Sequence, residues 1–162
     1  MIVRDAVIGD AEAVRNVASA AWRDTYAGML AGATIESFVA NAYSLERVER
    51  RIAGHTFLVV EEGSGIAAFV DAIRESDRIN LFAIYALPKS RGRGAGSALL
   101  DVLRERFPDP PVAADVLDGN RKGEVFYEHR GFVPRERLEE ELFGESVVER
   151  RWWLGSPPTP NG

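Results

Sequence analysis

The spacing of apolar residues changes several times along the chain, and each change predicts a new element. Ile2 to Ala6 alternates enough to indicate a first strand. A helical spacing follows, with Asp10 placed as its N-cap. The apolar residues of this helix share one face, at Val14, Val17, Ala18, Ala21 and Trp22. Thr34 and Ser44 are placed to cap two further helices.

Three β-rich runs occupy the middle of the chain. His55–Glu61 and Gly65–Ile73 are joined by a short connector, residues 62–64, which indicates a hairpin. The third run, Ile79–Leu87, is too short for an uncapped helix. It ends at Pro88, which has no N–H to give to a ladder. Together the three runs predict an antiparallel meander.

After Pro88 the chain reads as a glycine-rich turn that leads into an amphipathic helix. The turn is Arg91-Gly92-Arg93-Gly94-Ala95-Gly96, and the helix carries apolar residues at Leu99, Val102, Leu103 and Phe107. Glycines let a backbone turn tightly and bring several N–H groups close to a ligand. The positive end of the helix dipole points to the same place, so this segment favours the binding of a phosphate group.

A fifth strand is predicted over Val112–Leu117. Because a helix crosses over before it, this strand should lie parallel to the run of residues 79–87. Asn120 is placed to cap the next helix, which ends at Gly131, a residue suited to a left-handed C-cap.

The end of the chain predicts a final pair of strands and a tail. Phe132-Val133 begins a sixth strand, and Ser146–Leu154 forms a seventh. The stretch from Arg135 to Gly144 is polar and acidic, and we expect it to be a connection between them. Residues 155–162 are rich in proline and small polar residues, which is typical of a disordered tail.

Three phosphate-binding motifs compete for the glycine loop. A P-loop needs Lys-Ser or Lys-Thr after its glycines, and neither follows here. A dinucleotide fingerprint needs G-x-G-x-x-G directly after the strand. Gly92 and Gly94 fit that fingerprint, but Ser97 holds the third glycine position and several residues separate the strand from the loop. An acid at about the right distance, Asp115 or Asp118, keeps the dinucleotide interpretation open.

The third candidate fits best. Arg91, Gly94 and Gly96 match the Gln/Arg-x-x-Gly-x-Gly/Ala pyrophosphate loop of the GCN5-related N-acetyltransferases, the GNAT family. Upstream, residues 83–88 look like the fourth strand of that family. Downstream, the N…FY…GF segment of the family is matched by Asn120, Phe126-Tyr127 and Gly131-Phe132. In motifs and in order of elements the whole chain therefore resembles this family.

The resemblance implies an α/β fold of the GNAT type. This fold is a mixed, mostly antiparallel sheet of seven strands, with strands four and five parallel and helices on its faces. The likeness covers nearly the whole chain. We therefore expect one N-acetyltransferase domain over residues 1–154, followed by the tail.

The resemblance also implies a site for acetyl-CoA, the co-substrate, between strands four and five. Its pantetheine would pair like an added strand with Ala86 and Leu87, and a backbone N–H of residues 85–87 would hold the thioester oxygen. Asn120 either bonds the pantetheine arm or only caps its helix. The implied cofactor-binding residues are Tyr85, Ala86, Leu87, Arg91, Gly92, Arg93, Gly94, Ala95, Gly96, Ser97 and Asn120.

Acetyl transfer needs a neutral amine and a proton for the departing thiolate. Tyr127 sits where the family places its general acid, and a phenol stays protonated at neutral pH. The general base is less defined, because Asn80 stands where many relatives have a glutamate and an amide cannot take a proton. The alternatives are a water or one of three carboxylates, Glu61, Glu62 and Asp71.

Trp22 and Tyr26 fall in the region where the family binds its acceptors. They lie four residues apart, so both point from the same side of the first helix. They either pack in the core or line the acceptor cleft.

Composition narrows the function. The chain has no cysteine, which excludes disulfides and thiolate chemistry. It has only two histidines as potential nitrogen ligands, so we expect no metal site. A net charge of -5 disfavours nucleic acid as a partner and suits cationic amines. No apolar run approaches the ~20 residues of a membrane span, and the N-terminus lacks a signal peptide's apolar segment. We therefore expect a cytoplasmic protein without a membrane partner.

These observations predict an acetyl-CoA-dependent N-acetyltransferase acting on a primary amine of a small molecule or peptide. Two alternatives come from other classes. A non-catalytic acyl-CoA sensor is one, because Asn80 stands at the usual position of the base and cannot take a proton. A dinucleotide-binding oxidoreductase domain is the other. The acceptor-binding segments carry no pattern that identifies the amine, and a homodimer is left open.

Overall fold

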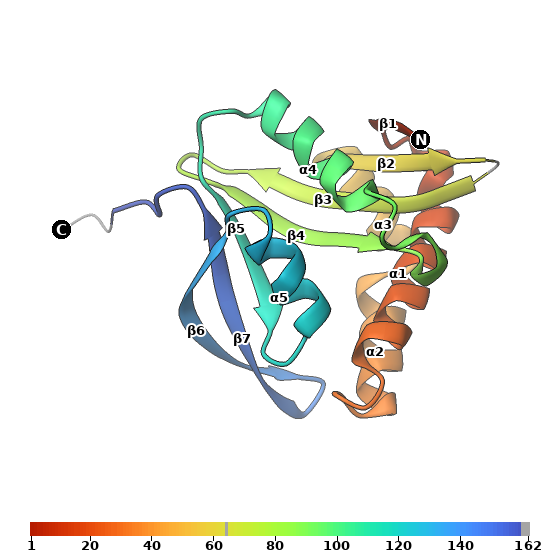
Figure 1. The fold of residues 1–162 in the computed structure, drawn as a ribbon. Helices are drawn as coiled ribbons and strands as arrows, with labels where there is room; N and C mark the ends of the chain where they lie inside the picture. The colour runs from red at the N-terminus through yellow and green to blue at the C-terminus, as the bar shows by residue number, and fades with distance from the viewer. Residues whose placement is uncertain (64, 160–162) are drawn as a thin grey trace.

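The computed structural model describes residues 1–63 and 65–159, and its centre is one mixed sheet (Figure 1). The strand order is β1-β2-β3-β4-β5-β7-β6, with β4 and β5 parallel and the other neighbours antiparallel. This is the predicted GNAT-type architecture. The strands are β1 (Ile2–Asp5), β2 (Thr56–Glu62), β3 (Gly65–Arg74), β4 (Ile79–Ala86), β5 (Val112–Leu117), β6 (Val133–Leu142) and β7 (Glu145–Leu154).

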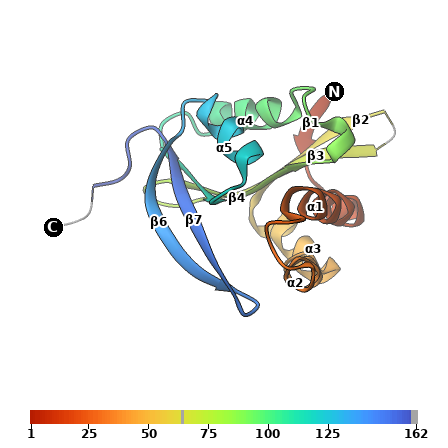
Figure 2. The ribbon, with the colours of Figure 1, turned by 60° about the horizontal axis from the view of Figure 1, so that its bottom comes forward.

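Helices cover both faces of the sheet (Figure 2). On one face lie α4 (Ala95–Arg106) and α5 (Arg121–Glu128). On the other lie α1 (Ala11–Tyr26), α2 (Gly32–Ala42) and α3 (Leu45–Gly54). Two short 3₁₀ turns, η1 (Ile8–Asp10) and η2 (Pro88–Ser90), precede α1 and the glycine loop. Across the described ranges, none of these helices has the length and apolar character needed to cross a bilayer.

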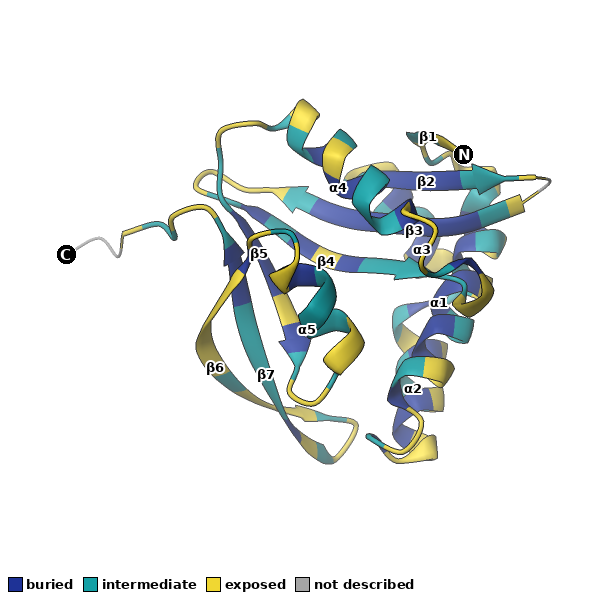
Figure 3. Cartoon of the chain, viewed as in Figure 1, coloured by how far each residue is buried: buried dark blue, intermediate teal, exposed yellow. Residues whose placement is uncertain are grey.

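The core has two layers, because successive strand residues point to opposite faces. Leu58 and Val70 are fully buried with Leu99 of α4 on one side of the sheet. Phe69 is fully buried with Val14 of α1 on the other side. The buried positions run through the middle of β2 and β3, while β6 is mostly exposed (Figure 3).

Helix caps follow the sequence where no tertiary partner competes. Ser44 caps α3 by accepting a hydrogen bond from the Arg47 N–H at 3.3 Å, as predicted. Thr34 was expected to cap α2 and does not, because the helix begins earlier and its hydroxyl donates to Glu145 at 2.7 Å. Asp10 does precede α1, but its carboxylate accepts from Arg4 at 2.8 Å and caps no helix N–H. Other hydrogen-bond partners thus override these two local capping preferences.

The prediction of a polar connection over Arg135–Gly144 is wrong. Most of that stretch belongs to β6, which pairs with β7 through a tight turn at Phe143 and Gly144. β6 is the edge strand of the sheet and is exposed along nearly its whole length. Because neither face of β6 is fully buried, its sequence does not alternate apolar and polar residues, and that alternation is the pattern that predicts a strand.

A bulge in β4 opens the sheet. β4 and β5 are joined along residues 79–81 and 112–114. The register between β3 and β4 shifts there, because Ala72 pairs with Leu81 while Asp71 pairs with Ala83. Phe82 is the extra residue, and a bulge of this kind bends its strand. Beyond it β4 and β5 separate and leave a wedge.

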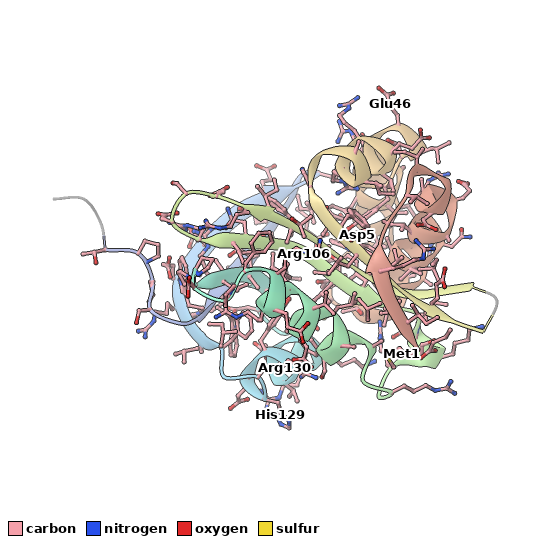
Figure 4. All side chains as sticks on the ribbon, turned by 90° about the horizontal axis from the view of Figure 1, so that it is seen from above. Met1, Asp5, Glu46, Arg106, His129 and Arg130 are labelled. Atoms are coloured by element: carbon pink, nitrogen blue, oxygen red, sulfur yellow. The ribbon has the colours of Figure 1, made fainter. Side chains whose placement is uncertain are left out.

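The N-terminal strand β1 is bound to α4, whereas the described part of the C-terminal tail forms no helix or strand. Arg106 at the end of α4 holds Asp5 of β1 through two hydrogen bonds of 2.8 and 3.0 Å (Figure 4). In the predicted tail, residues 155–159 have no regular secondary structure. Residues 160–162 of that tail, and Ser64 of the predicted hairpin connector, lie outside the described residues.

The β6–β7 turn gives a stability prediction. Phe143 has φ of 47° and is 52% exposed, so a bulky residue sits in the left-handed region with little contact to compensate. Phe143→Asn should raise the free energy of unfolding by about 0.5–1 kcal/mol, measured by urea denaturation, because Asn tolerates this conformation. Phe143→Ala removes the ring but keeps the strained Cβ and should bring no such gain. An equal gain in both variants would contradict this explanation.

Candidate active site

The wedge between β4 and β5 forms a cavity of about 1010 Å³. Its walls come from β4 between Leu81 and Ala86, the glycine loop, β5 and α5, and the end of α1. Four separate parts of the chain therefore converge on one space. This cavity is large enough to bury a ligand of substantial size.

The glycine loop presents the start of α4 to the cavity. Gly92 and Gly94 have φ of 79° and 85°, a left-handed conformation that side-chain-bearing residues avoid. α4 begins at Ala95, and its first amide bonded within the helix is that of Ala98, which donates to Gly94. The N–H groups before it remain available for a ligand, and the residues that carry them line the cavity: Ala95, Gly96 and Ser97. This arrangement of amides suits the binding of an anion.

Basic side chains surround the same mouth. Arg91 donates to Asp24 of α1 and to Thr25 Oγ1, the latter at 3.1 Å. Lys122 of α5 lies 3.4 Å from the same Asp24 carboxylate. The hydrogen bond from Arg91, followed by its charge and that of Lys122, lowers the pKa of Asp24. Arg93, by contrast, is exposed and does not line the cavity.

The backbone of β4 corrects part of the predicted cofactor set. Leu87 donates its N–H to Ala67 at 2.8 Å, and its carbonyl accepts from Ser90 at 2.8 Å. Leu87 is therefore already used and is not free to pair with a ligand strand, contrary to the prediction. In an antiparallel ladder alternate residues turn their backbone groups to opposite sides. Tyr85 thus faces β3 like Leu87, whereas Ala86 turns its N–H and carbonyl to the wedge.

Close packing fixes α5 against α4. A Cβ on Gly96 would lie 2.6 Å from Cε2 of Phe126, so only glycine fits there without movement. The Arg130 guanidinium covers the same Phe126 ring at 3.9 Å and also donates to Ser97. The ring is thus held between two elements, and α5 is positioned beside the glycine loop.

Tyr127 follows on α5 and reaches the cavity. It is 7% exposed and packs edge-on against Phe126 and Phe132, with ring centroids 5.2 and 4.9 Å away. Burial, followed by the nearby Tyr26 and Asp115, raises the pKa of the Tyr127 phenol. Tyr127 therefore keeps its proton at neutral pH and can act only as a donor to a strong base such as a thiolate.

Asn120 caps α5 as predicted, because its side chain accepts from the Gly123 N–H at 3.1 Å. Its Nδ2 also donates to the Tyr26 hydroxyl at 3.4 Å. Both residues line the cavity. A contact of Asn120 with a pantetheine arm stays a prediction.

The predicted pair Trp22 and Tyr26 separates. Trp22 stacks on Phe38 at 3.7 Å and donates its Nε1–H to the Tyr85 hydroxyl at 2.9 Å. It is buried and does not line the cavity, so it packs in the core. Tyr26 is also mostly buried, yet it forms part of the cavity wall.

The carboxylates that the sequence offered as bases lie away from the cavity lining. Glu61 accepts a hydrogen bond of 2.8 Å from Arg4 of β1, and Glu62 ends β2 next to it. Asp71 is 1% exposed on β3. Asp115 does line the cavity, but its carboxylate accepts hydrogen bonds of 2.8 and 3.1 Å from Arg151.

Sequence reasoning missed several lining residues. Asp24 and Thr25 meet Arg91 only through the packing of α1, and no local pattern marks that contact. Arg121 and Lys122 were detectable, because two basic residues at the start of a predicted helix break the usual preference for acids there.

Comparisons with known proteins agree with this geometry. The family model of the acetyltransferase (GNAT) domain matches residues 53–134. No curated protein matches the chain in sequence.

Solved structures share the fold across nearly the whole chain. The PaiA N-acetyltransferase from Thermoplasma acidophilum, in complex with coenzyme A, has a TM-score of 0.77 at 23% identity, covering 92% of this chain and 96% of its own. A GCN5-related N-acetyltransferase from Rhodopseudomonas palustris has a TM-score of 0.80 at 19% identity, with coverage of 94% and 93%. A ribosomal-protein-alanine N-acetyltransferase from Brucella melitensis has 0.69 at 21%, with coverage of 95% and 99%.

The contact between Gly96 and Phe126 gives a second prediction. Gly96→Ala should lower the free energy of unfolding by about 1–2 kcal/mol in urea, because the new methyl forces the clamped ring to move. This loss should appear although alanine is the better helix former by about 1 kcal/mol. Gly9→Ala is the matched control, because a Cβ there meets no atom within 4 Å. Equal unfolding midpoints for both variants would contradict the clamp.

Proposed function

The chain belongs to the GNAT acetyltransferase family, and on that premise we propose that it moves an acetyl group from acetyl-CoA to a primary amine of a small molecule or peptide. The transfer proceeds by direct attack in a ternary complex. One observation carries the proposal: the start of α4, the free edge of β4 and the Tyr127 side chain all line the same cavity. A thioester with a diphosphate at one end needs these three features together.

The glycine loop suits the diphosphate of the co-substrate. The N–H groups at the start of α4 supply hydrogen bonds, and Arg91 and Lys122 supply charge. Ala86, whose backbone faces the wedge, suits pairing with the amides of the pantetheine arm. The PaiA acetyltransferase, which shares this fold, is in complex with coenzyme A, and this supports a coenzyme A species as the co-substrate.

Tyr127 suits the role of general acid. Acetyl-CoA supplies an activated acetyl group as a thioester. The amine nitrogen forms a bond to the carbonyl carbon, the C–S bond breaks, and its electron pair goes to sulfur. The Tyr127 hydroxyl then gives its proton to that sulfur, the nitrogen loses its extra proton to water, and Tyr127 regains a proton from solvent. Backbone N–H groups of β4 that face the wedge stabilise the negative charge on the carbonyl oxygen during attack.

Calorimetric titration with acetyl-CoA, coenzyme A and NAD tests the cofactor. We expect selective binding of the two coenzyme A species and none of NAD. Gly94→Glu should abolish this binding, because it puts a negative charge and a strained side chain at φ of 85° in the anion site. Undiminished affinity in that variant, or a preference for NAD in the wild type, would overturn the cofactor assignment.

Kinetics with an amine panel separate an enzyme from an acyl-CoA sensor. Tyr127→Phe should lower kcat by about 10- to 1000-fold, the range of positioned acids and bases, and leave acetyl-CoA affinity nearly intact. Tyr43→Phe is the matched control, since Tyr43 is equally buried but does not line the cavity. An unchanged kcat in Tyr127→Phe would remove that residue from the mechanism. A wild type that binds acetyl-CoA but acetylates no amine would favour the sensor.

A further inference from the structure

The proposed reaction requires a general base, a group that takes the proton of the attacking amine, and the residues described so far do not supply one. Asn80 of β4 cannot do so, and it points away from the α4 side, since its neighbours Ile79 and Leu81 are buried there. The face that Asn80 shares is the one covered by α1 and α3. A base for the reaction should therefore be sought on that face, near the bulge.

A histidine–aspartate pair, of which the aspartate is buried, lies on this face. His55 Nδ1 is 2.7 Å from Asp71 Oδ1. The Asp71 side chain is 1% exposed, whereas that of His55 is 23% exposed. When Asp71 is ionised and the imidazole is neutral, Nδ1 of His55 donates to the carboxylate and Nε2 is the nitrogen with a free lone pair.

The pair stands beside the bulge that opens the wedge. The His55 ring stacks on Phe82 with centroids 5.8 Å apart and planes at 28°. Phe82 is the bulged residue, is 54% exposed and lines the cavity. Asp71 is the register partner of Ala83, the next residue of β4. The imidazole thus lies next to the point where β4 leaves β5, on the side away from α4.

We propose that His55 is the general base of the acetyl transfer and that Asp71 positions it; this rests on the proposed function. His55 Nε2 takes a proton from the acceptor amine, directly or through one water, as the N–C bond forms. The C–S bond breaks and Tyr127 gives its proton to the sulfur. The proton on His55 then leaves to solvent and Tyr127 regains one, so both groups return to their starting state.

The charged groups around His55 come from two elements. Asp71 projects from β3, and Arg51 of α3 reaches within 3.8 Å of the second Asp71 oxygen. Burial raises the pKa of Asp71, and the hydrogen bond and charge of His55, followed by the charge of Arg51, oppose that rise. Arg51 also lies 4.6 Å over the ring of Tyr43. From β4 the ring meets the uncharged Phe82.

The test combines pH-dependent kinetics with NMR. The panel contains benzylamine, putrescine, glycinamide and a tripeptide with a free N-terminus, and kcat/KM is measured for the best acceptor from about pH 5 to 9, which brackets histidine titration. His55→Asn places an amide where Nδ1 stood, so it keeps a donor to Asp71 and removes the base. We expect kcat/KM near neutral pH to fall by about 100-fold and its acid limb to vanish, with acetyl-CoA affinity unchanged.

Two further variants separate catalysis from structure. Since the chain has two histidines, NMR resolves both rings, and His129→Gln assigns them. His129 is exposed at the end of α5, so this variant should keep wild-type kinetics (Figure 4). The acid limb of the wild type should have the same midpoint as the His55 titration. Asp71→Asn should move both midpoints to lower pH together, because it removes a negative charge beside the imidazolium.

The outcomes are distinct. An active His55→Asn variant with a wild-type acid limb overturns the base assignment and leaves the proposed function standing. An acid limb that does not follow the His55 titration does the same. A wild type that binds acetyl-CoA but acetylates none of the panel contradicts the proposed function, and the base assignment with it.

Discussion

The structure depends on a single interruption of backbone pairing. Two parallel strands with a regular register would continue side by side and satisfy each other's N–H and carbonyl groups. The extra residue at Phe82 ends that pairing after residues 79–81. The edge of β4 that follows is then unpaired inside the protein, where it lines a cavity. An unpaired strand edge of this kind is stable only if solvent or a ligand satisfies it, and this requirement explains why the cavity lies here.

The other parts of the site are arranged around this opening. α4 starts at its wide end because Gly92 and Gly94 turn the chain back over the sheet. α5 is held beside α4 by the ring of Phe126 over Gly96, and that contact places Tyr127 in the wall. On the opposite face, His55 and Asp71 meet next to the same bulge. The groups to which we assign catalytic roles thus come from separate elements that meet where the β4–β5 pairing ends.

The sequence predicts those parts of the fold that burial controls. The helices, the central strands and the parallel pair could be placed because a buried face imposes a spacing. β6 could not, since neither face of this edge strand is fully buried. The glycine loop was visible as a motif and so was Tyr127. The bulge at Phe82, the contact of Asp24 with Arg91 and the pairing of His55 with Asp71 were not, because each depends on which distant residues the fold brings together.

The carboxylate of Asp24 has a consequence for turnover. It already holds Arg91 and Lys122 at the mouth of the cavity, so under the proposed function an arriving diphosphate would replace one anion with another. The free energy gained there is the difference between two ion pairs, which is smaller than the gain at bare cations. A ligand bound through such an exchange is also easier to lose, since Asp24 is ready to retake its partners. Acetyl-CoA and coenzyme A share the diphosphate, so a modest affinity for it avoids slow release of the product, a step that limits many enzymes.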